Sequence, residues 1–313
     1  MTVLVTGGAG FIGSHLVESL LARGDRVVCL DNFDPFYDPA VKRRNLDGVQ
    51  AHPSFSLVEG DVRDVDLLTE VLTREAVEKV VHLAARAGVQ PSRADPLGYQ
   101  DVNVRGTVAV LEAARRAGVR QFVFGSSSTV YGDTTPVPFS EDAPAVGQLV
   151  PYGASKRAAE LFAYTYHRLY DLPVTCLRFF SVHGPRLRPD LAIHLFTRKI
   201  DRGETITLYG DQARDCTYIA DIVEGVVAAI DRPFPFEIIN LGDSSPVRVS
   251  EMVRVIEECL GRSAVINRAP PRPGDAPETY ADIAKARKLL GFEPRVPLAE
   301  GIAHFVEWYR AQP

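Results

Sequence analysis

The sequence has few of the features that mark secreted, metal-binding or membrane proteins. Its 313 residues include only four cysteines, two methionines and one tryptophan. The cysteines lie far apart, without CxxC or Cys/His spacing, so we expect reduced thiols in a cytosolic protein and no metal site. No apolar run approaches the ~20 residues that a membrane span requires. No run of basic residues marks a membrane surface.

Acidic and basic residues are nearly balanced, and this balance argues against a nucleic-acid partner. The formal net charge is −5 and the pI is about 5.8, so the chain lacks the basic excess of nucleic-acid-binding proteins. It starts directly in an apolar segment, Met1–Val5, without the regions of a signal peptide, which again predicts a cytoplasmic protein. A hydrophobic content of 46% allows a large globular core. These features favour small-molecule chemistry.

A glycine-rich segment between two apolar runs is the first indication of function. Residues 3–31 read VLVTGGAGFIGSHLVESLLARGDRVVCLD, which predicts a strand, a tight loop, a helix and a second strand. Glycines in GxxGxxG spacing suit a tight turn, close approach of backbone N–H groups to a pyrophosphate, and close packing of the helix on the strand. The positive end of the helix would attract the phosphates.

An acidic residue at the end of the second strand indicates which cofactor is bound. Asp31 follows Gly13 by 18 positions, where a carboxylate can accept hydrogen bonds from both hydroxyls of an adenosine ribose. The same carboxylate would repel a 2′-phosphate, so the sequence favours NAD over NADP. The contacts that we expect to this cofactor are Gly7, Gly10, Phe11, Ile12, Gly13, Asp31, Asn32, Asp61, Val62, Leu83, Ala84, Ala85, Tyr152 and Lys156.

Asp61 follows the third predicted strand, Ser56–Gly60, and has two compatible interpretations. At this edge of the sheet it could accept a hydrogen bond from the adenine amino group. It could also be the N-cap of a helix predicted for Val65–Thr73.

A fully apolar fourth strand is predicted for Lys79–Leu83. The small residues Ala84 and Ala85 follow it and let the backbone run close to the nicotinamide ribose. His82 lies inside this strand, which leaves no open position around it, so we expect a hydrogen-bonded core residue rather than a catalytic base. Further along, Asp101–Ala117 has helical spacing of apolar residues and ends at a glycine.

The order of the predicted elements indicates the fold class. Short apolar strands alternate with helices up to residue 179, which predicts an α/β fold with a Rossmann-like doubly wound parallel sheet. Beyond this point the pattern is mixed, the segment SVHGPRLRPD is interpreted as a loop, and we expect a smaller mixed α/β substrate lobe. We therefore assign residues 1–179 to an NAD-binding Rossmann domain, with parts of 217–242 returning to it, and residues 180–313 to the lobe.

A tyrosine and a lysine one helical turn apart carry the predicted chemistry. Tyr152 and Lys156 of YGASK share one face of a helix over Tyr152–Tyr170. A phenol with a pKa near ~10 becomes a usable base if a lysine ammonium and an oxidised nicotinamide ring stabilise the phenolate. Ser127 lies in the serine cluster that follows the fifth predicted strand, Gln121–Phe124, and could bond the same reacting oxygen. Lone YxxxK pairs arise by chance, but this one follows a nucleotide fold and a serine cluster.

Several motifs together resemble the extended short-chain dehydrogenase/reductase family, in its nucleotide-sugar epimerase and dehydratase branch. They are TGGAGFIG, HLAA, SSSTVYG, YGASK, LRFF-x-V-x-GP, YGD-x-x-x-RD-x-TYI-x-D and RPGD, and they cover essentially the whole chain. The resemblance implies a triad of Ser127, Tyr152 and Lys156, with Tyr152 the base and Lys156 also holding the nicotinamide ribose. It also implies a homodimer in which Asp101–Ala117 and Tyr152–Tyr170 of each subunit form a four-helix bundle.

Within that branch, two stretches resemble UDP-glucuronate 4-epimerases, namely DNFDPFYDPAVKRRNL and RFFSVHGPRLRPDLA. UDP-glucose 4-epimerases and UDP-glucuronate decarboxylases usually have asparagine in place of Ser181. Two positions depart from the subgroup, because Gln90 replaces the usual arginine and His183 the usual tyrosine. The residues that the resemblance assigns to a UDP-sugar are Ser127, Ser128, Thr129, Ser181, Arg188, Arg214, Arg272 and Asp275.

The implied reaction is C4 epimerisation of UDP-glucuronate to UDP-galacturonate, with NAD kept bound. Tyr152 removes the C4 hydroxyl proton while hydride passes to NAD, the 4-keto sugar turns about its diphosphate, and hydride returns to the other face. A UDP-glucose 4-epimerase or a UDP-glucuronate decarboxylase would share every step up to the ketone. A silent NAD-binding protein on the same fold would be expected to lack the tyrosine–lysine pair.

Overall fold

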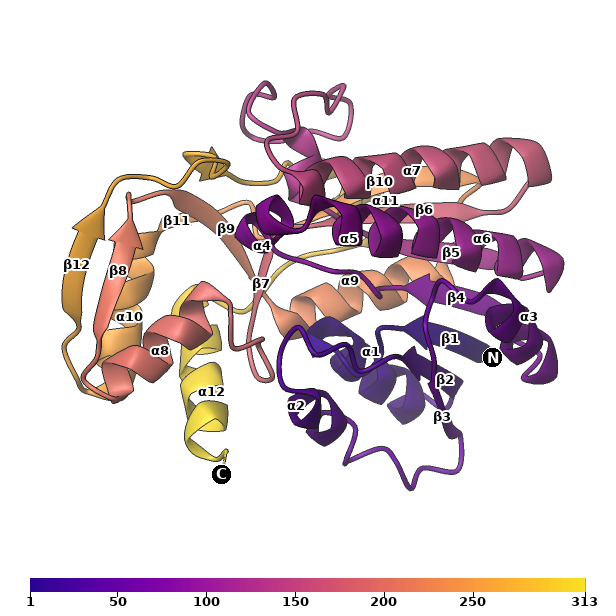
Figure 1. The fold of residues 1–313 in the computed structure, drawn as a ribbon, viewed down its shortest axis with the longest axis horizontal. Helices are drawn as coiled ribbons and strands as arrows, with labels where there is room; N and C mark the ends of the chain where they lie inside the picture. Colours follow the sequence, from indigo (N-terminus) through magenta and orange to yellow (C-terminus); the bar gives the residue numbers. More distant parts are fainter. Residues whose placement is uncertain (313) are drawn as a thin grey trace.

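The computed structural model describes residues 1–312 and has a seven-stranded parallel sheet at its centre (Figure 1). The strand order is β10-β6-β5-β4-β1-β2-β3, and all neighbours are parallel. The order reverses between β1 and β4, which is where doubly wound sheets bind ligands. The predicted fold class is confirmed. The strands are β1 (Thr2–Thr6), β2 (Arg26–Asp31), β3 (Phe55–Glu59), β4 (Lys79–His82), β5 (Gln121–Ser127), β6 (Val174–Phe179) and β10 (Phe236–Leu241).

Helices cover both faces of this sheet, as Figure 1 shows. The strands are buried on both sides, which explains why the sequence of β1 and β2 is continuously apolar instead of alternating. One face carries α3 (Val65–Arg74), α6 (Gly106–Arg116) and α7 (Pro151–Tyr170). The other face carries α1 (Phe11–Ala22) and α9 (Ile219–Asp231), with α11 (Ala284–Leu290) beside β10. A short helix, α2 (Pro39–Arg44), follows β2.

A smaller lobe extends from one end of the sheet, at the left of Figure 1. It contains a four-stranded sheet around β9 and a separate parallel pair of β8 and β12. Its strands are β7 (Ser181–His183), β8 (Thr205–Tyr209), β9 (Ala213–Tyr218), β11 (Pro246–Arg248), β12 (Val265–Ala269) and β13 (Glu278–Thr279). Its helices are α8 (Ala192–Asp201), α10 (Val249–Leu260) and α12 (Leu298–Arg310). Within residues 1–312, no helix is both long enough and apolar enough to span a bilayer.

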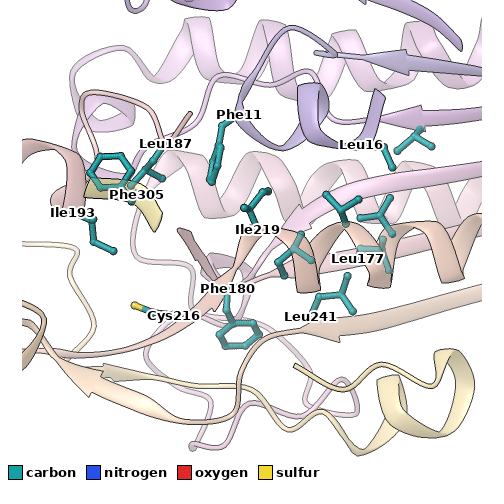
Figure 2. Packing of buried hydrophobic residues seen from close by; sticks show 14 of the residues in the cluster. Phe11, Leu16, Leu177, Phe180, Leu187, Ile193, Cys216, Ile219, Leu241 and Phe305 are labelled. Atoms are coloured by element: carbon teal, nitrogen blue, oxygen red, sulfur yellow. The ribbon is translucent and has the colours of Figure 1, made fainter. Parts of the chain in front are cut away.

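One hydrophobic cluster continues from the sheet into this lobe. Figure 2 shows Leu177 and Leu241 beside the helix that begins at Ile219, and further along the same cluster Ile193 and Phe305 of the lobe. All these side chains are at most 5% exposed. The two parts of the chain therefore share a core, and the domain boundary expected at residue 179 stays a prediction.

The helix expected over Asp101–Ala117 is present, but the expectation missed its wide first turn. It starts with a wide π-helical turn, η1 (Asp101–Arg105), before α6 begins, and two unpredicted short helices precede it, α4 (Val89–Ala94) and α5 (Pro96–Gln100). Within η1 the Asn103 amide bonds the backbone N and O of Arg86 at 2.8 and 2.9 Å. This tertiary contact accompanies the wide turn, which apolar spacing alone does not reveal.

The interpretation of SVHGPRLRPD as a loop is also partly wrong. Its first three residues form β7, which pairs in parallel with β9 from Ser181↔Cys216 to His183↔Tyr218. Three residues are too short to show a two-residue period. The strand exists because a partner some thirty positions along the chain supplies its hydrogen bonds.

Candidate active site

A cavity of about 920 Å³ lies at the carboxyl ends of β1, β4 and β5 and reaches into the smaller lobe. Every predicted site residue except Asp61 lines it. The residues that meet there are Gly7, Gly10, Phe11, Ile12, Gly13, Asp31, Asn32, Val62, Leu83, Ala84, Ala85, Ser127, Ser128, Thr129, Tyr152, Lys156, Ser181, Arg188, Arg214, Arg272 and Asp275.

The glycine loop fits a pyrophosphate. Gly7 has φ +69°, and a Cβ there would lie 2.7 Å from the Ala84 nitrogen, so the loop packs directly on the end of β4. A Cβ on Gly13 would lie 2.2 Å from the Gly7 oxygen. Gly10 precedes α1 without a side-chain cap, so the N–H groups of the first helical turn are left for a ligand.

Asp31 is 5% exposed and is held by the backbone around it. Oδ2 accepts a hydrogen bond from the Ala9 nitrogen at 3.2 Å and Oδ1 accepts one from the Phe33 nitrogen at 2.9 Å. Two bonds leave acceptor capacity for ribose hydroxyls. Lys42 of α2, which sequence reasoning missed, also lines the cavity with its Nζ 3.7 Å from Oδ1.

The interpretation of Asp61 as a helix cap is wrong. The N-cap of α3 is Asp64, whose Oδ1 accepts a hydrogen bond from the Leu67 nitrogen at 3.0 Å. The Asp61 carboxylate accepts bonds from Asn32 Nδ2 and from the backbone and guanidinium nitrogens of Arg63. The hydrogen bond from the Arg63 side chain lowers the pKa of Asp61 to about 2. Its contact with adenine stays a prediction.

His82 is a core residue, as predicted. It is fully buried, and its Nδ1 lies 2.7 Å from Thr6 Oγ1 while its Nε2 lies 3.0 Å from Thr107 Oγ1. Burial, and then the charge of Lys156, lowers the pKa of His82 to about 3. The ring is therefore neutral and hydrogen-bonded on both sides.

Ser127 and Lys156 both line the cavity where β5 ends beside α7. Lys156 is 3% exposed, donates a hydrogen bond to the Gly125 oxygen at 2.6 Å, and lies 4.8 Å from the centre of the Phe124 ring. Burial lowers the pKa of Lys156 to about 7. Ser127 Oγ accepts bonds from the nitrogen and the hydroxyl of Thr129 at 3.2 and 3.0 Å, so its own proton is free to be donated.

Tyr152 projects from the first turn of α7 into the same place. Burial raises the pKa of Tyr152, while a hydrogen bond with Ser127 and the charge of Arg188 act in the opposite direction. The protein groups alone therefore keep the phenol protonated. A phenolate at neutral pH needs a further positive charge beside it.

Arg188 connects several segments at the sugar end of the cavity. Its Nε and Nη2 donate to the Asp190 carboxylate at 3.0 and 2.7 Å, and Nη2 also donates to the Ala87 oxygen at 3.4 Å. Its guanidinium lies 5.4 Å from the centre of the Phe36 ring. Ser181 is exposed to the cavity at the start of β7.

The far end of the cavity carries the remaining charged groups. Arg214 of β9 is half-buried, and burial lowers the pKa of its guanidinium while the Asp275 carboxylate acts the other way. Arg272 lies over the Tyr209 ring at 3.5 Å from its centre. Asp275 Oδ1 accepts a hydrogen bond from Gln90 Nε2 at 3.2 Å. Tyr209 begins the quoted YGD motif but was not among the predicted site residues, because only the fold brings its ring against Arg272.

Comparison with known proteins identifies the family. A family model described as GDP-mannose 4,6 dehydratase matches residues 4–305. The chain belongs to this family. It is part of the extended short-chain dehydrogenases/reductases, in the nucleotide-sugar epimerase branch that the motifs resemble.

Named relatives of this family are similar over almost the whole chain. UDP-glucuronate 4-epimerase 4 of Arabidopsis thaliana is 41% identical over 329 residues, covering 99% of this chain and 75% of that protein. UDP-glucuronic acid 4-epimerase from Bacillus cereus, solved in complex with UDP-glucuronic acid and NAD, has 34% identity and a TM-score of 0.94, with 99% of both chains covered. UDP-glucose 4-epimerase from Thermotoga maritima, solved with UDP-glucose, has 32% identity and a TM-score of 0.90 over the same coverage.

Proposed function

We propose that this chain is an NAD-dependent UDP-glucuronate 4-epimerase that interconverts UDP-glucuronate and UDP-galacturonate. The observation that carries the proposal is one cavity that joins a dinucleotide-type glycine loop, a Tyr152–Lys156 pair and a hydroxyl-rich sugar end with Ser181 and Arg188. The similarity to UDP-glucuronate 4-epimerases over 99% of the chain supports it.

The cofactor is NAD, and the residues at the glycine-loop end of the cavity would hold it. The uncapped first turn of α1 would bind its pyrophosphate, and Asp31 its adenosine ribose. When bound, NAD accepts the C4 hydride and returns it, and its positively charged ring favours the Tyr152 phenolate. Lys156 would donate hydrogen bonds to the nicotinamide ribose.

Tyr152 is the proposed general base, and Ser127 the donor to the reacting oxygen. The phenolate takes the proton from the C4 hydroxyl, and the Ser127 hydroxyl donates to the same oxygen as it becomes a carbonyl. After the ketone has turned, the phenol gives the proton back. Both side chains lie beside the carboxyl end of β5. Because the sugar turns between the two steps, the same two side chains can act on either of its faces.

The sugar end would hold the C6 carboxylate away from a damaging geometry. The intermediate is a β-keto acid, which loses CO₂ most readily when the C5–C6 bond is perpendicular to the ketone plane. The hydroxyls of Ser128, Thr129 and Ser181 would donate hydrogen bonds to the carboxylate, with Arg188 bracing the loop. Each bond contributes about 1 kcal/mol net, somewhat more to a charged acceptor, so several are needed.

Arg214, Arg272 and Asp275 are the proposed anchor of the UDP part. Arginine side chains present two parallel donors to phosphate oxygens. A carboxylate such as Asp275 can accept bonds from both ribose hydroxyls. An anchor at the diphosphate leaves the sugar free to turn in the cavity.

UDP-glucose 4-epimerase is the second candidate, supported by the similarity to the Thermotoga maritima enzyme. The hydroxyl of Ser181, rather than the amide of an asparagine, favours a carboxylate on the sugar. Net decarboxylation shares the ketone, but the residues that line the cavity give no support for it.

A homodimer is part of the proposal. The outer face of α7 leaves large apolar side chains in solvent, with Leu161 52%, Phe162 42% and Leu169 66% exposed. Helices α6 and α7 lie side by side in Figure 1, as a four-helix bundle with a second copy requires. A cytoplasmic location is proposed with it, since Cys29, Cys176, Cys216 and Cys259 are free thiols.

To decide which sugar is the substrate, the purified protein is incubated with UDP-glucuronate and with UDP-glucose in separate reactions. We expect NMR to resolve UDP-galacturonate from the first, with little or no conversion in the second. Preferential conversion of UDP-glucose would replace the proposal by the second candidate. Light scattering of the same sample should give twice the chain mass of 34.3 kDa.

A further inference from the structure

A buried ionic cluster lies behind the catalytic helix, and the proposed reaction does not use it. Glu160 of α7 and Arg178 of β6 are each 1% exposed. Arg178 donates from Nε to Glu160 Oε1 and from Nη2 to Glu160 Oε2, both at 2.8 Å. This is the planar two-bond geometry of a strong arginine–carboxylate pair.

Glu160 also ties the end of β5 to α7. Its Oε1 accepts a hydrogen bond from Ser126 Oγ at 2.7 Å. Lys156, one turn earlier on α7, donates to the Gly125 oxygen at 2.6 Å. Gly125 and Ser126 directly precede Ser127, so two consecutive residues of the strand are bonded to the helix that carries Tyr152. The separation between Ser127 and Tyr152 depends on this attachment.

A buried cluster of charges is not explained by stability alone. Removing charged groups from water costs several kcal/mol per ion, and well-packed apolar side chains of similar volume often stabilise a core as well. Glu160 has four donors in reach, because Arg157 Nη1 also donates to its Oε2 at 2.9 Å. The carboxylate is therefore fully hydrogen-bonded and fixed in orientation.

The charge of Glu160 acts on Lys156. The two residues are four positions apart on α7 and share a face. Burial lowers the pKa of Lys156 to about 7, and the Glu160 carboxylate is the main group that opposes this. The other titratable groups near Lys156 are Tyr152, one turn earlier on α7, Cys176 on β6 and His82 on β4, and burial favours the neutral form of each.

Arg178 keeps Glu160 in its charged form. Burial alone would raise the pKa of Glu160, but the hydrogen bonds and charge of Arg178 outweigh it and lower that pKa. Arg178 therefore stabilises the charged form of Glu160, and Glu160 in turn stabilises the ammonium form of Lys156.

We propose that Glu160 is a positioning residue of the epimerase, which fixes the β5 end that carries Ser127 against α7 and stabilises the ammonium form of Lys156. The inference rests on the proposed function. It assigns the Arg178–Glu160–Ser126 cluster a role in the reaction that a purely structural ion pair would not have.

The first test measures Lys156 directly and needs no turnover. The chain has six lysines, so NMR of protein labelled with carbon-13 at lysine Cε can follow each one, with Lys156→Arg to assign the signal. We expect Glu160→Gln to move the Lys156 titration midpoint down by roughly 1 pH unit or more. Glu258→Gln, which removes an exposed glutamate, should leave it in place.

The second test measures turnover of UDP-glucuronate against pH. In Glu160→Gln the alkaline limb of kcat should move down with the Lys156 midpoint, while KM changes little. Ser126→Ala keeps the charge and loses the strand contact, so we expect kcat to fall roughly threefold to tenfold with the limb unmoved. The Glu258→Gln enzyme should match the wild type in both measurements.

A double variant keeps the proposal testable if the single Glu160 variant does not fold. Glu160→Met with Arg178→Met removes both charges together and leaves no unpaired carboxylate, so the fold should tolerate it better than a single change. It should also lower the Lys156 midpoint, but by less than Glu160→Gln does, because the positive charge of Arg178 is removed together with the carboxylate. An unchanged midpoint and pH profile in a folded variant would overturn the proposal. If the wild type turns over neither sugar, the proposed function fails, and the lysine titration still decides the effect of Glu160.

Discussion

The two ends of the cavity are built from different kinds of groups. At the cofactor end, backbone atoms of Gly7 and Gly13 and the first turn of α1 form the surface, and a single added carbon would collide with it. At the sugar end, side chains of Ser181, Arg188 and Arg214 come from separate segments. A backbone surface recognises shape and resists change, whereas a side-chain surface can be altered one residue at a time. Relatives named for UDP-glucuronate and for UDP-glucose accordingly share this fold.

The largest effect should come from the residue that serves both ends. Tyr152→Phe removes the hydroxyl that takes the proton, so epimerisation should fall by about 10³-fold. The ring still packs, so bound NAD, measured by extraction and absorbance, should stay near the wild-type amount. Tyr166→Phe, on the same helix but hydrogen-bonded to Glu112, is the matched control. Near-normal turnover in Tyr152→Phe would remove it from the mechanism.

The cofactor end should lose NAD affinity when a single methyl group is added to its glycine loop. In Gly13→Ala the new Cβ would lie 2.2 Å from the Gly7 oxygen and 2.8 Å from Gly8 Cα, so the backbone must move. We expect NAD to bind roughly 100-fold more weakly, equivalent to about 2.8 kcal/mol. Gly48→Ala adds the same carbon, with only Glu18 Oε1 within 4 Å, at 3.8 Å. Calorimetric titration of both variants tests this, and equal affinities would contradict it.

At the cofactor end, a substitution of Asp31 should change NAD affinity and the preference over NADP without abolishing binding. Asp31→Ala removes the acceptor for the ribose hydroxyls and the negative charge that repels a 2′-phosphate. We expect NAD affinity to fall roughly tenfold and the preference over NADP to shrink, since Lys42 remains nearby. Dissociation constants for both dinucleotides measure the change. Unaltered discrimination would count against the assignment.

The sugar end should show the smallest effect on rate but a change of product. Ser181→Ala removes one donor to the carboxylate, which is worth about 1 kcal/mol and somewhat more to a charged acceptor. Epimerisation should slow severalfold, and a larger fraction should leave as UDP-4-keto-pentose and CO₂. Arg188→Ala should act in the same direction by loosening the loop. NMR of products decides, with the exposed Ser263→Ala as control, and unchanged partitioning would refute the role in holding the carboxylate.

The cofactor end could be predicted from the sequence because its determinants are local. Gly7, Gly10, Gly13 and Asp31 lie within one strand–helix–strand unit, so their spacing alone indicates how they meet. Asp61 is different, because the choice between capping and another contact depended on Asp64, three residues further along. Lys42 could not be placed, since a helix of six residues gives too little periodicity to say which side is buried.

The sugar end was reached by resemblance, and the four-stranded sheet around β9 that supports it was not predicted. Strand β9, which carries Arg214, pairs with β7, β11 and β13, whose positions span almost one hundred residues. Such short strands form only when the partners are present. Glu160 could have been noticed, because YGASK is followed by a carboxylate four positions after Lys156 on the same helix face. Its partner Arg178 lies on a strand and could be found only in the folded structure.

The hydrophobic cluster that continues from the sheet into the smaller lobe also determines how the protein unfolds. Separating the two parts would expose apolar surface on both, including Phe180, Ile219 and Phe305 in Figure 2. Each such side chain contributes about 1.5 to 3 kcal/mol when buried. Neither part therefore gains by unfolding first, and the nucleotide and sugar ends of the cavity should be lost in one cooperative transition.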